Sequence, residues 1–368
     1  MAKKLTVLLS VVMAAAMLLV ACAPAATAAP AAPAAPAATT APAAPAAPAA
    51  AKLKVCMVTD SGGIGDKSFN DLTWKGVQNG IKDFGVDGKY IQSKNVSDFD
   101  ANLAACKDDG ANLIICVGFM MADSCQKAAT ANPKIYYAGV DMGGFNLPNF
   151  RGVTAKEEQS SYLAGYLSAG MTKTGILGWY VGIMGPAVQI FGDGWYYGAQ
   201  QYNKVHGTSV KVIGYDPLNP GKATVTGSWT DADKGRSLGA SMMDEGADII
   251  LPVAGGVGAA TAAVMKERGK GYIIGVDQDW TLTYPAYLPQ ILVSVLKSVD
   301  VHVYDAIKRI TTNTWQGGDY VLTLANGGTA LAYNKTIAVP DALKAEVADL
   351  AKKIISGEIT IPAPVAIK

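Results

Sequence analysis

The chain has 368 residues, a formal net charge of +1 and hydrophobic residues at 50% of its positions. A charge so close to zero excludes the broad basic surface that binding to nucleic acid requires, so no nucleic-acid partner is expected. Five cysteines and two histidines, none of them at zinc spacing, argue against a metal site and against catalysis by histidine. We therefore expect neither a metal nor a cofactor.

The N-terminus has the pattern of a secretory signal. Lys3 and Lys4 precede an apolar stretch, residues 5–20, that is too short and too rich in small residues for a comfortable membrane span. The stretch ends in Leu-Val-Ala-Cys, which resembles a bacterial lipobox, so residues 1–21 are expected to be removed and Cys22 to carry lipid. The alternative is an ordinary signal peptide with an incidental cysteine. A lipid on Cys22 places the protein at the cell membrane, on its extracytoplasmic side.

Between Cys22 and residue 51 the chain consists almost entirely of Ala, Pro and Thr. Repeated Ala-Ala-Pro cannot build a core and favours an extended, polyproline-like tether. The folded part is therefore expected to begin near residue 52. The remaining length is sufficient for two domains with their own cores.

Short apolar strands then alternate with amphipathic helices. The pattern predicts strands at 54–59, 89–93, 112–117, 134–140, 175–184, 209–214, 247–253 and 271–276. Such alternation is typical of an α/β protein with parallel sheets.

The two halves of the folded part resemble each other. Residues 108–141 align without a gap to residues 244–277, and both segments end in the same Gly-Val-Asp. Convergence on a common strand–helix–strand pattern is the alternative to a true repeat, but it also predicts two similar α/β units. Ligands of open parallel sheets bind outside the carboxyl ends of the strands, so we expect a cleft between two lobes.

Several residues follow or end these strands and are expected to face the cleft. They are Thr59, Asp60, Gly118, Phe119, Asp141, Met184, Gly185, Gly255, Gly256 and Asp277. Turn and helix-cap chemistry is the alternative for any single aspartate. It is a weaker explanation for Asp141 and Asp277, which occupy equivalent places in the two halves.

The glycine-rich turn at residues 59–65 raises the question of a phosphate ligand. The turn does not match the dinucleotide or P-loop motifs, and Lys67 is the only cation near it. The helix that follows begins instead with Ser68, Phe69 and Asn70. An aromatic ring between a hydroxyl and an amide suits a flat polar ring, although a core position on the helix explains Phe69 equally well.

Five segments form an ordered set of signatures: TDSGGIGDKSFN (59–70), EEQSSYLAGYLSAGMTKTGILG (157–178), DEGADIILPVAGGVG (244–258), IGVDQDW (274–280) and SVLKSVD (294–300). Together, behind a lipobox, they resemble the basic membrane protein family, the purine-nucleoside-receptor-like lipoproteins of ABC transporters. The resemblance implies an α/β fold of the type I periplasmic-binding-protein class. This fold has two Rossmann-like lobes with parallel sheets, joined by a three-strand hinge that closes on a ligand.

The resemblance also implies lobe boundaries and a role. Residues 52–155 and 278–316 are expected to form the first lobe, and residues 156–277 and 317–368 the second. The protein is expected to be a monomeric solute-binding protein, not an enzyme, that delivers a nucleoside to the permease subunits of an ABC importer. A purine ribonucleoside is the favoured ligand.

Carried over by resemblance, the ligand site consists of Asp60, Ser68, Phe69, Asn70, Asp141, Trp229, Gly255, Asp277 and Lys297. Phe69 and Trp229 are expected to stack on the two faces of the base, although the family usually has phenylalanine at the second position. Gly255, Asp277 and Lys297 are expected to hold the ribose hydroxyls, and Ser68 and Asn70 to contact the edge of the base. Lys297 is expected to begin a helix and to keep Asp277 ionised. Gln278 also departs from the family pattern.

Other functions stay open at this point. A receptor for a sugar or for a free nucleobase could use the same fold. A surface nucleoside hydrolase would need a metal or an acid–base set, and an adhesin would not need a paired crevice.

The cysteines carry one further expectation. Cys106 and Cys125 fall on two consecutive predicted helices and could form a disulfide. Cys56 and Cys116 lie within apolar strands and are expected to be buried thiols.

Overall fold

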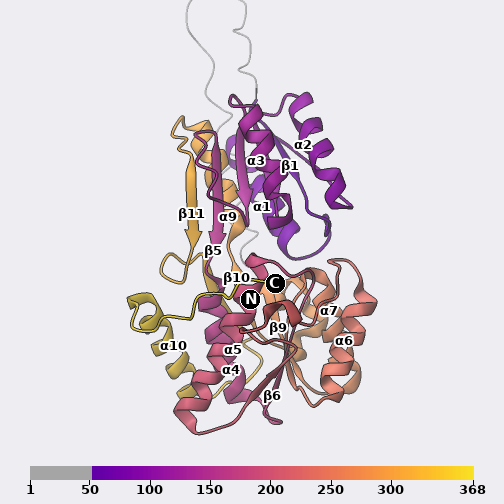
Figure 1. Cartoon of the computed structure of the whole chain (residues 1–368), viewed down its shortest axis with the longest axis vertical. Helices are drawn as coiled ribbons and strands as arrows, with labels where there is room; N and C mark the ends of the chain where they lie inside the picture. Colours follow the sequence, from indigo (N-terminus) through magenta and orange to yellow (C-terminus); the bar gives the residue numbers. More distant parts are fainter. Residues whose placement is uncertain (1–51) are drawn as a thin grey trace, which may run out of the picture. The chain divides into compact units, whose positions relative to one another are not determined.

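The structure is a computed structural model that describes residues 52–368 (Figure 1). The expected signal peptide, the lipidation site Cys22 and the Ala/Pro tether lie outside these residues. None of the helices in residues 52–368 combines the length and the apolar character needed to cross a membrane.

The first sheet has the strand order β11-β5-β4-β3-β1-β2, and all its pairings are parallel. Its strands are β1 (Lys54–Val58), β2 (Asp87–Ile91), β3 (Leu113–Val117), β4 (Tyr136–Val140), β5 (Phe150–Ala155) and β11 (Gly318–Leu322). Its helices are α1 (Phe69–Phe84), α2 (Phe99–Asp108), α3 (Ala122–Ala131) and α9 (Val299–Thr311).

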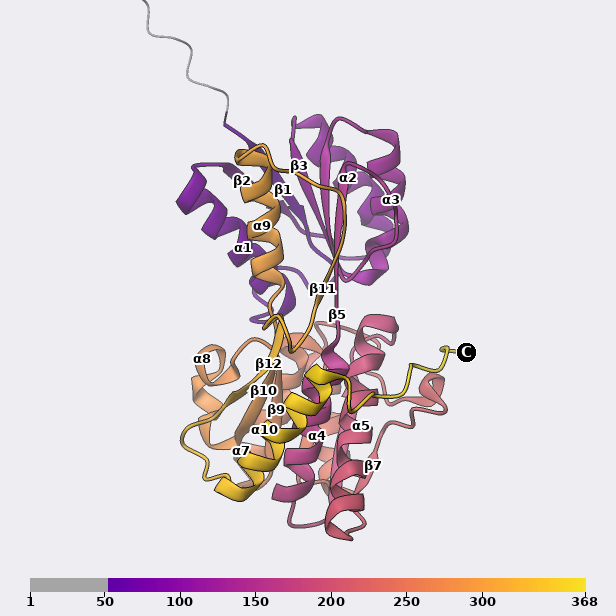
Figure 2. The same ribbon diagram turned by 90° about the vertical axis from the view of Figure 1, so that its left-hand side faces the viewer.

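Alternation along the strands gives this sheet two apolar faces. Val55 and Met57 pack with α1 and α9, whereas Cys56 and Val58 pack with α2 and α3. Figure 2 shows α1 and α9 side by side on one face, with α2 and α3 on the other. Both faces are buried in the middle of the sheet, which explains why β1, β3 and β4 are nearly continuous apolar runs.

The second sheet repeats this plan with the strand order β12-β10-β9-β8-β6-β7. Its strands are β6 (Ile176–Val181), β7 (Lys211–Ile213), β8 (Ile249–Val253), β9 (Tyr272–Asp277), β10 (Ile291–Lys297) and β12 (Thr329–Tyr333), the last antiparallel to β10. Its helices are α4 (Glu157–Met171), α5 (Pro186–His206), α6 (Ala232–Asp244), α7 (Gly258–Arg268), α8 (Trp280–Thr283) and α10 (Asp341–Ser356). Helix α4 packs against α5 and α10, and α6 packs against α7.

Short 3₁₀ helices complete the chain: η1 (Val96–Asp98), η2 (Phe119–Met121), η3 (Pro220–Lys222), η4 (Gly255–Val257) and η5 (Pro285–Gln290). The aligned halves of the sequence correspond to the same order of elements, β3–η2–α3–β4 in one lobe and β8–η4–α7–β9 in the other. The α/β class and the two lobes with parallel sheets are therefore confirmed.

The chain crosses between the sheets three times, from β5 to α4, from β10 to α9 and from β11 to β12. The crossings are tied to one another, because the Lys156 N–H donates to the Leu322 carbonyl (2.8 Å) and the Ser298 N–H donates to the Gly328 carbonyl (2.9 Å).

Two expected lobe boundaries differ from the structure. Residues 278–297 belong with the second sheet, because β10 pairs with β9 and β12. Residues 318–322 belong with the first sheet, because β11 pairs with β5. The aligned repeat ends at Asp277, one strand before the chain crosses, so the repeat does not mark the boundary.

The expected Cys106–Cys125 disulfide is wrong. The structure has two disulfides, Cys56–Cys106 and Cys116–Cys125, with Cα–Cα distances of 5.7 Å and 6.2 Å. The strands present Cys56 and Cys116 on the face that α2 and α3 cover, so each helix cysteine meets the strand beneath it rather than the neighbouring helix.

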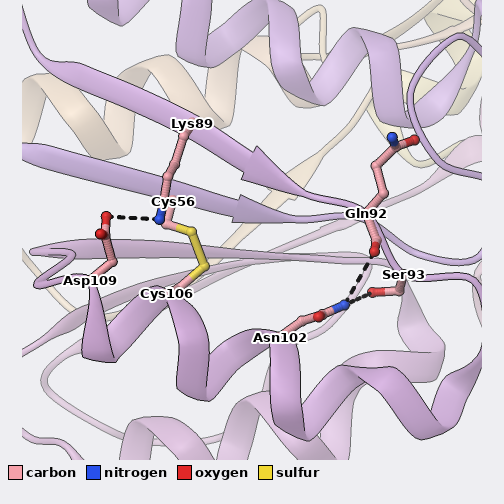
Figure 3. The surroundings of a disulfide bond; sticks show 7 residues. All are labelled: Cys56, Lys89, Gln92, Ser93, Asn102, Cys106 and Asp109. Atoms are coloured by element: carbon pink, nitrogen blue, oxygen red, sulfur yellow. Dashed lines mark hydrogen bonds and ion pairs between the residues drawn. A yellow bond between two sulfur atoms is a disulfide. The ribbon is translucent and has the colours of Figure 1, made fainter.

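Polar contacts flank the first of these bridges (Figure 3). Lys89 pairs with Asp109 at 2.8 Å, and the Asn102 amide donates to Ser93 at 3.0 Å and to the Gln92 carbonyl at 3.4 Å. The disulfide thus attaches α2 to β1, and the polar contacts on either side of it attach α2 to β2 and to the residues that follow β2.

Candidate functional site

A pocket lies where the carboxyl ends of the strands of both lobes meet. It encloses about 600 Å³ of empty space, including the part that opens to solvent. The structure brings together, as lining residues, Asp60, Phe69, Asn70, Asp141, Trp229, Gly255, Asp277 and Lys297. Ser68 is the expected site residue that does not line the pocket. Its hydroxyl instead donates a hydrogen bond to Asp277 of the other lobe.

Two aromatic residues contribute to the walls from opposite lobes. Phe69 begins α1, and Trp229 lies in the loop before α6. The indole of Trp229 occupies the space where a side chain at Gly182 would lie, so the glycine is needed for the larger ring. The indole N–H is buried and has no hydrogen-bond partner among the described residues.

The N-terminus of α1 is already occupied by a carboxylate. Asp66 Oδ1 accepts from the N–H groups of Ser68 (2.9 Å) and Asp71 (3.1 Å), and its Oδ2 accepts from the Asn70 N–H (2.9 Å). Free N–H groups at a helix start are what a phosphate would use. The turn therefore holds a carboxylate of the protein in the place of a phosphate.

Asn70 has a different role from the base-edge contact expected of it. Its Nδ2 donates to Asp60 Oδ1 (2.7 Å) and to Asp66 Oδ2 (3.0 Å), and its Oδ1 accepts from the Asp60 N–H (3.2 Å). Both amide donors are thus used within the protein. Asn70 orients Asp60, whose Oδ2 has no hydrogen-bond partner among the described residues. Burial raises the pKa of Asp60 to about 6.

Asp141 and Asp277 end equivalent strands in equivalent conformations. Both have left-handed backbone angles, with φ of 61° and 65°, a conformation that aspartate tolerates better than most residues. Burial raises the pKa of Asp277 to about 6, while Lys297 and the Ser68 hydroxyl oppose the shift.

Lys297 is the last residue of β10, not the beginning of a helix. Its Nζ lies 2.7 Å from Asp141 Oδ1 and 2.8 Å from Oδ2, so its direct partner is Asp141 rather than the expected Asp277. Glu157 Oε1 is 3.6 Å away. Burial raises the pKa of Glu157 to about 8, against the attraction of Lys297.

Phe119, one of the residues expected at the strand ends, also lines the pocket, and it matches Gly255 in the alignment of the two halves. The sequence did not indicate three other residues of the site. Asp66 and Phe191 line the pocket, and Glu157 lies beside its lysine. None of these three has a comparable signal in the sequence.

Direct hydrogen bonds also join the lobes beside the pocket. Gln278 Nε2 donates to the Ser68 carbonyl (3.0 Å), and the Tyr284 hydroxyl donates to the Asp66 carbonyl (3.2 Å). The pocket is therefore bounded on this side by contacts that require the lobes to be close together.

The lining favours recognition over chemistry. Carboxylates outnumber the one lysine, which disfavours a phosphorylated ligand and favours a neutral molecule rich in N–H and O–H donors. No cluster of three or more potential metal ligands occurs in residues 52–368. A GxSxG pattern at 235–239 lies inside α6 and not on the strand–turn–helix elbow that a serine nucleophile requires.

Comparison with known proteins agrees with this geometry. The family model described as Bmp, ABC transporter substrate-binding protein PnrA-like, matches residues 53–364. The ABC transporter nucleoside-binding protein BmpA of Lactococcus lactis subsp. cremoris is 32% identical over 336 residues, which cover 84% of this chain and 89% of the relative. Basic membrane protein A1 of Borrelia garinii subsp. bavariensis is 31% identical over 316 residues, with 84% and 88% covered.

Among solved structures, a solute-binding protein of an ABC transporter system from Aeropyrum pernix K1 superposes with a TM-score of 0.76 at 26% identity. The match covers 85% of this chain and 94% of that one. The family description and the names of the Lactococcus and Aeropyrum proteins are those of binding proteins and not of enzymes. The chain belongs to the basic membrane protein family of ABC transporter substrate-binding proteins.

Proposed function

We propose that the protein binds a purine ribonucleoside in the interlobe pocket and delivers it to the permease subunits of an ABC importer. The observation that carries the proposal is the pairing of two aromatic walls from opposite lobes, Phe69 and Trp229, with a lining dominated by carboxylates. A base is flat enough to stack between aromatic side chains, and stacking on one such ring is worth about 1–3 kcal/mol.

The polar groups divide between the base and the sugar. The free Oδ2 of Asp60 accepts from an N–H group at the edge of the base. Asp277 accepts from the ribose hydroxyls, and a carboxylate can accept from two neighbouring hydroxyls at once. Lys297 supports the sugar end because its positive charge opposes the burial-driven rise in the pKa of Asp277.

Binding and closure are one equilibrium in this proposal. Phe69 and Asp60 belong to the first lobe, whereas Trp229 and Asp277 belong to the second. A ligand that contacts both sets favours the closed arrangement over open ones and shifts the population toward it. The closed form is then the species that the permease recognises.

The N-terminal sequence supplies the location. Cleavage before Cys22 and lipidation of that cysteine would hold the protein on the outer face of the membrane, with residues 23–51 as the tether. Mass spectrometry of the N-terminal peptide from the native host tests this. A diacylated Cys22 is expected, and an unmodified cysteine at this position contradicts the anchor.

Isothermal titration with inosine, 2′-deoxyinosine and hypoxanthine tests the ligand assignment. Removing one hydroxyl leaves a buried carboxylate lone pair unmet, which costs about 1–3 kcal/mol. Inosine should therefore bind roughly tenfold or more tightly than 2′-deoxyinosine, and hypoxanthine more weakly still. Equal affinities for all three contradict the ribose contact. Tighter binding of hypoxanthine, or of glucose as a comparison sugar, identifies a different solute.

A further inference from the structure

We propose that Phe119 sets the size limit of the ligand, because its ring forms the wall between the ligand pocket and a second cavity in the same cleft. The inference rests on the proposed function, since it concerns which nucleosides the pocket accepts.

The second cavity lies directly beside the first. It encloses about 810 Å³ of empty space, including the part that opens to solvent, and residues of both lobes line it, among them Met142, Thr154 and Ile190. Phe119 and Asp141 are the residues that line both cavities. The partition between the cavities therefore consists of these two side chains.

The two parts of this partition differ in how firmly they are held. Asp141 is fixed by its ion pair with Lys297, whose Nζ is within 2.8 Å of both carboxylate oxygens. Phe119 follows β3 of the first lobe, yet its ring packs against the apolar core of the second lobe. The ring is an uncharged contact between lobes, so it can be removed without leaving a buried charge unpaired.

Gly185 gives the ring its place in the second lobe. A Cβ built at Gly185, just before α5, would overlap the Phe119 ring, and three ring atoms are its nearest neighbours. The backbone at Gly185 is extended, a conformation open to any residue. The absence of a side chain there is explained by the ring and not by the backbone angles.

The internal repeat shows that a 3₁₀ helix can begin at this place without an aromatic ring. Phe119 in η2 is equivalent to Gly255 in η4, and both residues begin a 3₁₀ helix after the third strand of their sheets in chain order. The backbones of the two turns differ, because the left-handed residue is Gly255 itself (φ 55°) in the second lobe and Gly118 (φ 93°), just before Phe119, in the first. The side chain of Phe119 acts in the cleft.

Substitution Phe119→Ala should join the two cavities and admit nucleosides with a bulky group. The probes are adenosine, N6-benzyladenosine and 5′-O-benzoyladenosine, titrated against the wild-type protein and the variant. We expect the affinity of at least one benzyl or benzoyl derivative, relative to adenosine, to rise by about tenfold or more in the variant, the scale on which a hydrophobic pocket discriminates small changes in size. An unchanged or lowered ratio for both derivatives overturns the proposal.

Two further variants make the test specific. Ile190→Ala changes a residue that lines only the second cavity, so with the Phe119 ring in place it should leave the ratio unchanged; an equal gain in this variant overturns the role of Phe119. Gly185→Ala should displace the ring and weaken adenosine binding, and Phe119→Ala should remove that effect in the double variant. If the two substitutions instead reduce adenosine affinity additively, the contact between Gly185 and the Phe119 ring does not have this role. Adenosine binding by the wild type is measured first. If the wild type does not bind adenosine, the result counts against the proposed function and not against the role of Phe119.

Discussion

Lys297 Nζ lies 2.7 Å from Asp141 Oδ1, and this ion pair joins the last residue of β10 in the second lobe to the residue after β4 in the first. Only 2% of Lys297 is exposed. A charge this deeply buried is tolerated only when it is paired. The contact therefore belongs to the closed arrangement, in which both partners are shielded from water.

Replacing Lys297 with Met should destabilise the closed protein strongly. The change leaves Asp141 without its partner, and breaking a buried pair by removing one charge typically costs about 3–5 kcal/mol. Urea unfolding and nucleoside titration measure the loss. The double variant Lys297→Met, Asp141→Asn removes both charges and should recover part of the stability. A double variant less stable than Lys297→Met alone would show that the pair is not the cause.

Glu157 should make stability fall as the pH rises. Burial raises its pKa from 4.5 to about 8, so between these values the folded state keeps a proton that the unfolded chain has lost. The free energy of unfolding then decreases with rising pH across this range, and the stabilising contribution is complete only below pH 4.5. Two charged groups face the Glu157 carboxyl group. Lys297 lowers its pKa, whereas Asp141 raises it.

The Glu157→Gln variant isolates this effect. Glutamine has nearly the same shape and does not titrate, so the stability difference between the variant and the wild type should begin to grow above pH 4.5 and should increase up to about pH 8, in favour of the variant. Asp60 and Asp277, whose pKa values are raised from 3.8 to about 6, add a fall in the same direction between these two values in both proteins. Thermal unfolding between about pH 5 and 9 measures the slopes. Parallel curves over the whole range would mean that Glu157 is ionised when buried.

The disulfides should contribute unequally to stability. The Cys56–Cys106 bridge spans 50 residues and the Cys116–Cys125 bridge spans 9. If the bridges act by restricting the unfolded chain, their contributions are about 4 and about 3 kcal/mol. The Cys56→Ser, Cys106→Ser variant should thus lose more stability in chemical denaturation than the Cys116→Ser, Cys125→Ser variant. The reverse order, or free thiols in the oxidised wild type, contradicts this.

The sequence predicts the fold well because both lobes use buried parallel strands. Apolar runs such as β3 and β8 are continuous, and the repeat around them gives the same order of strands and helices in both lobes. Four strands are absent from the prediction: β5, β10, β11 and β12. β10 is an apolar, buried run and does have a strand signal, whereas β11 and β12 are short and more exposed segments next to the hinge. Their assignment depends on the strand that each one pairs with, and that is a tertiary property.

The site divides in the same way. The strand-end aspartates are predictable because the ends of parallel strands must face one edge of the sheet. The ion-pair partner of each charged residue is not predictable from the sequence. Lys297 lies near several carboxylates, and only the tertiary structure determines that it pairs with Asp141. The disulfides fail for a similar reason, because the spacing of cysteines along the chain does not tell whether a helix cysteine faces the sheet or the next helix.

The aromatic walls supply the last prediction. If Phe69 and Trp229 hold a base between them, Phe69→Ala should weaken nucleoside binding by about ten- to a hundredfold without unfolding the protein, since each stacking contact is worth about 1–3 kcal/mol. Trp229→Ala should cause a similar loss. Trp229→Phe should keep most of the affinity, because a ring remains to stack on the base.

The controls separate stacking from packing. Val77, on the buried side of α1, is a core residue that does not line the pocket, so Val77→Ala should lower stability and leave affinity unchanged. Phe69→Leu retains apolar volume but loses the flat face, and it should bind nearly as weakly as Phe69→Ala. If Phe69→Leu binds as tightly as the wild type, the residue acts through its volume alone. In that case Phe69 is part of the core of α1, and the base must be held by other groups.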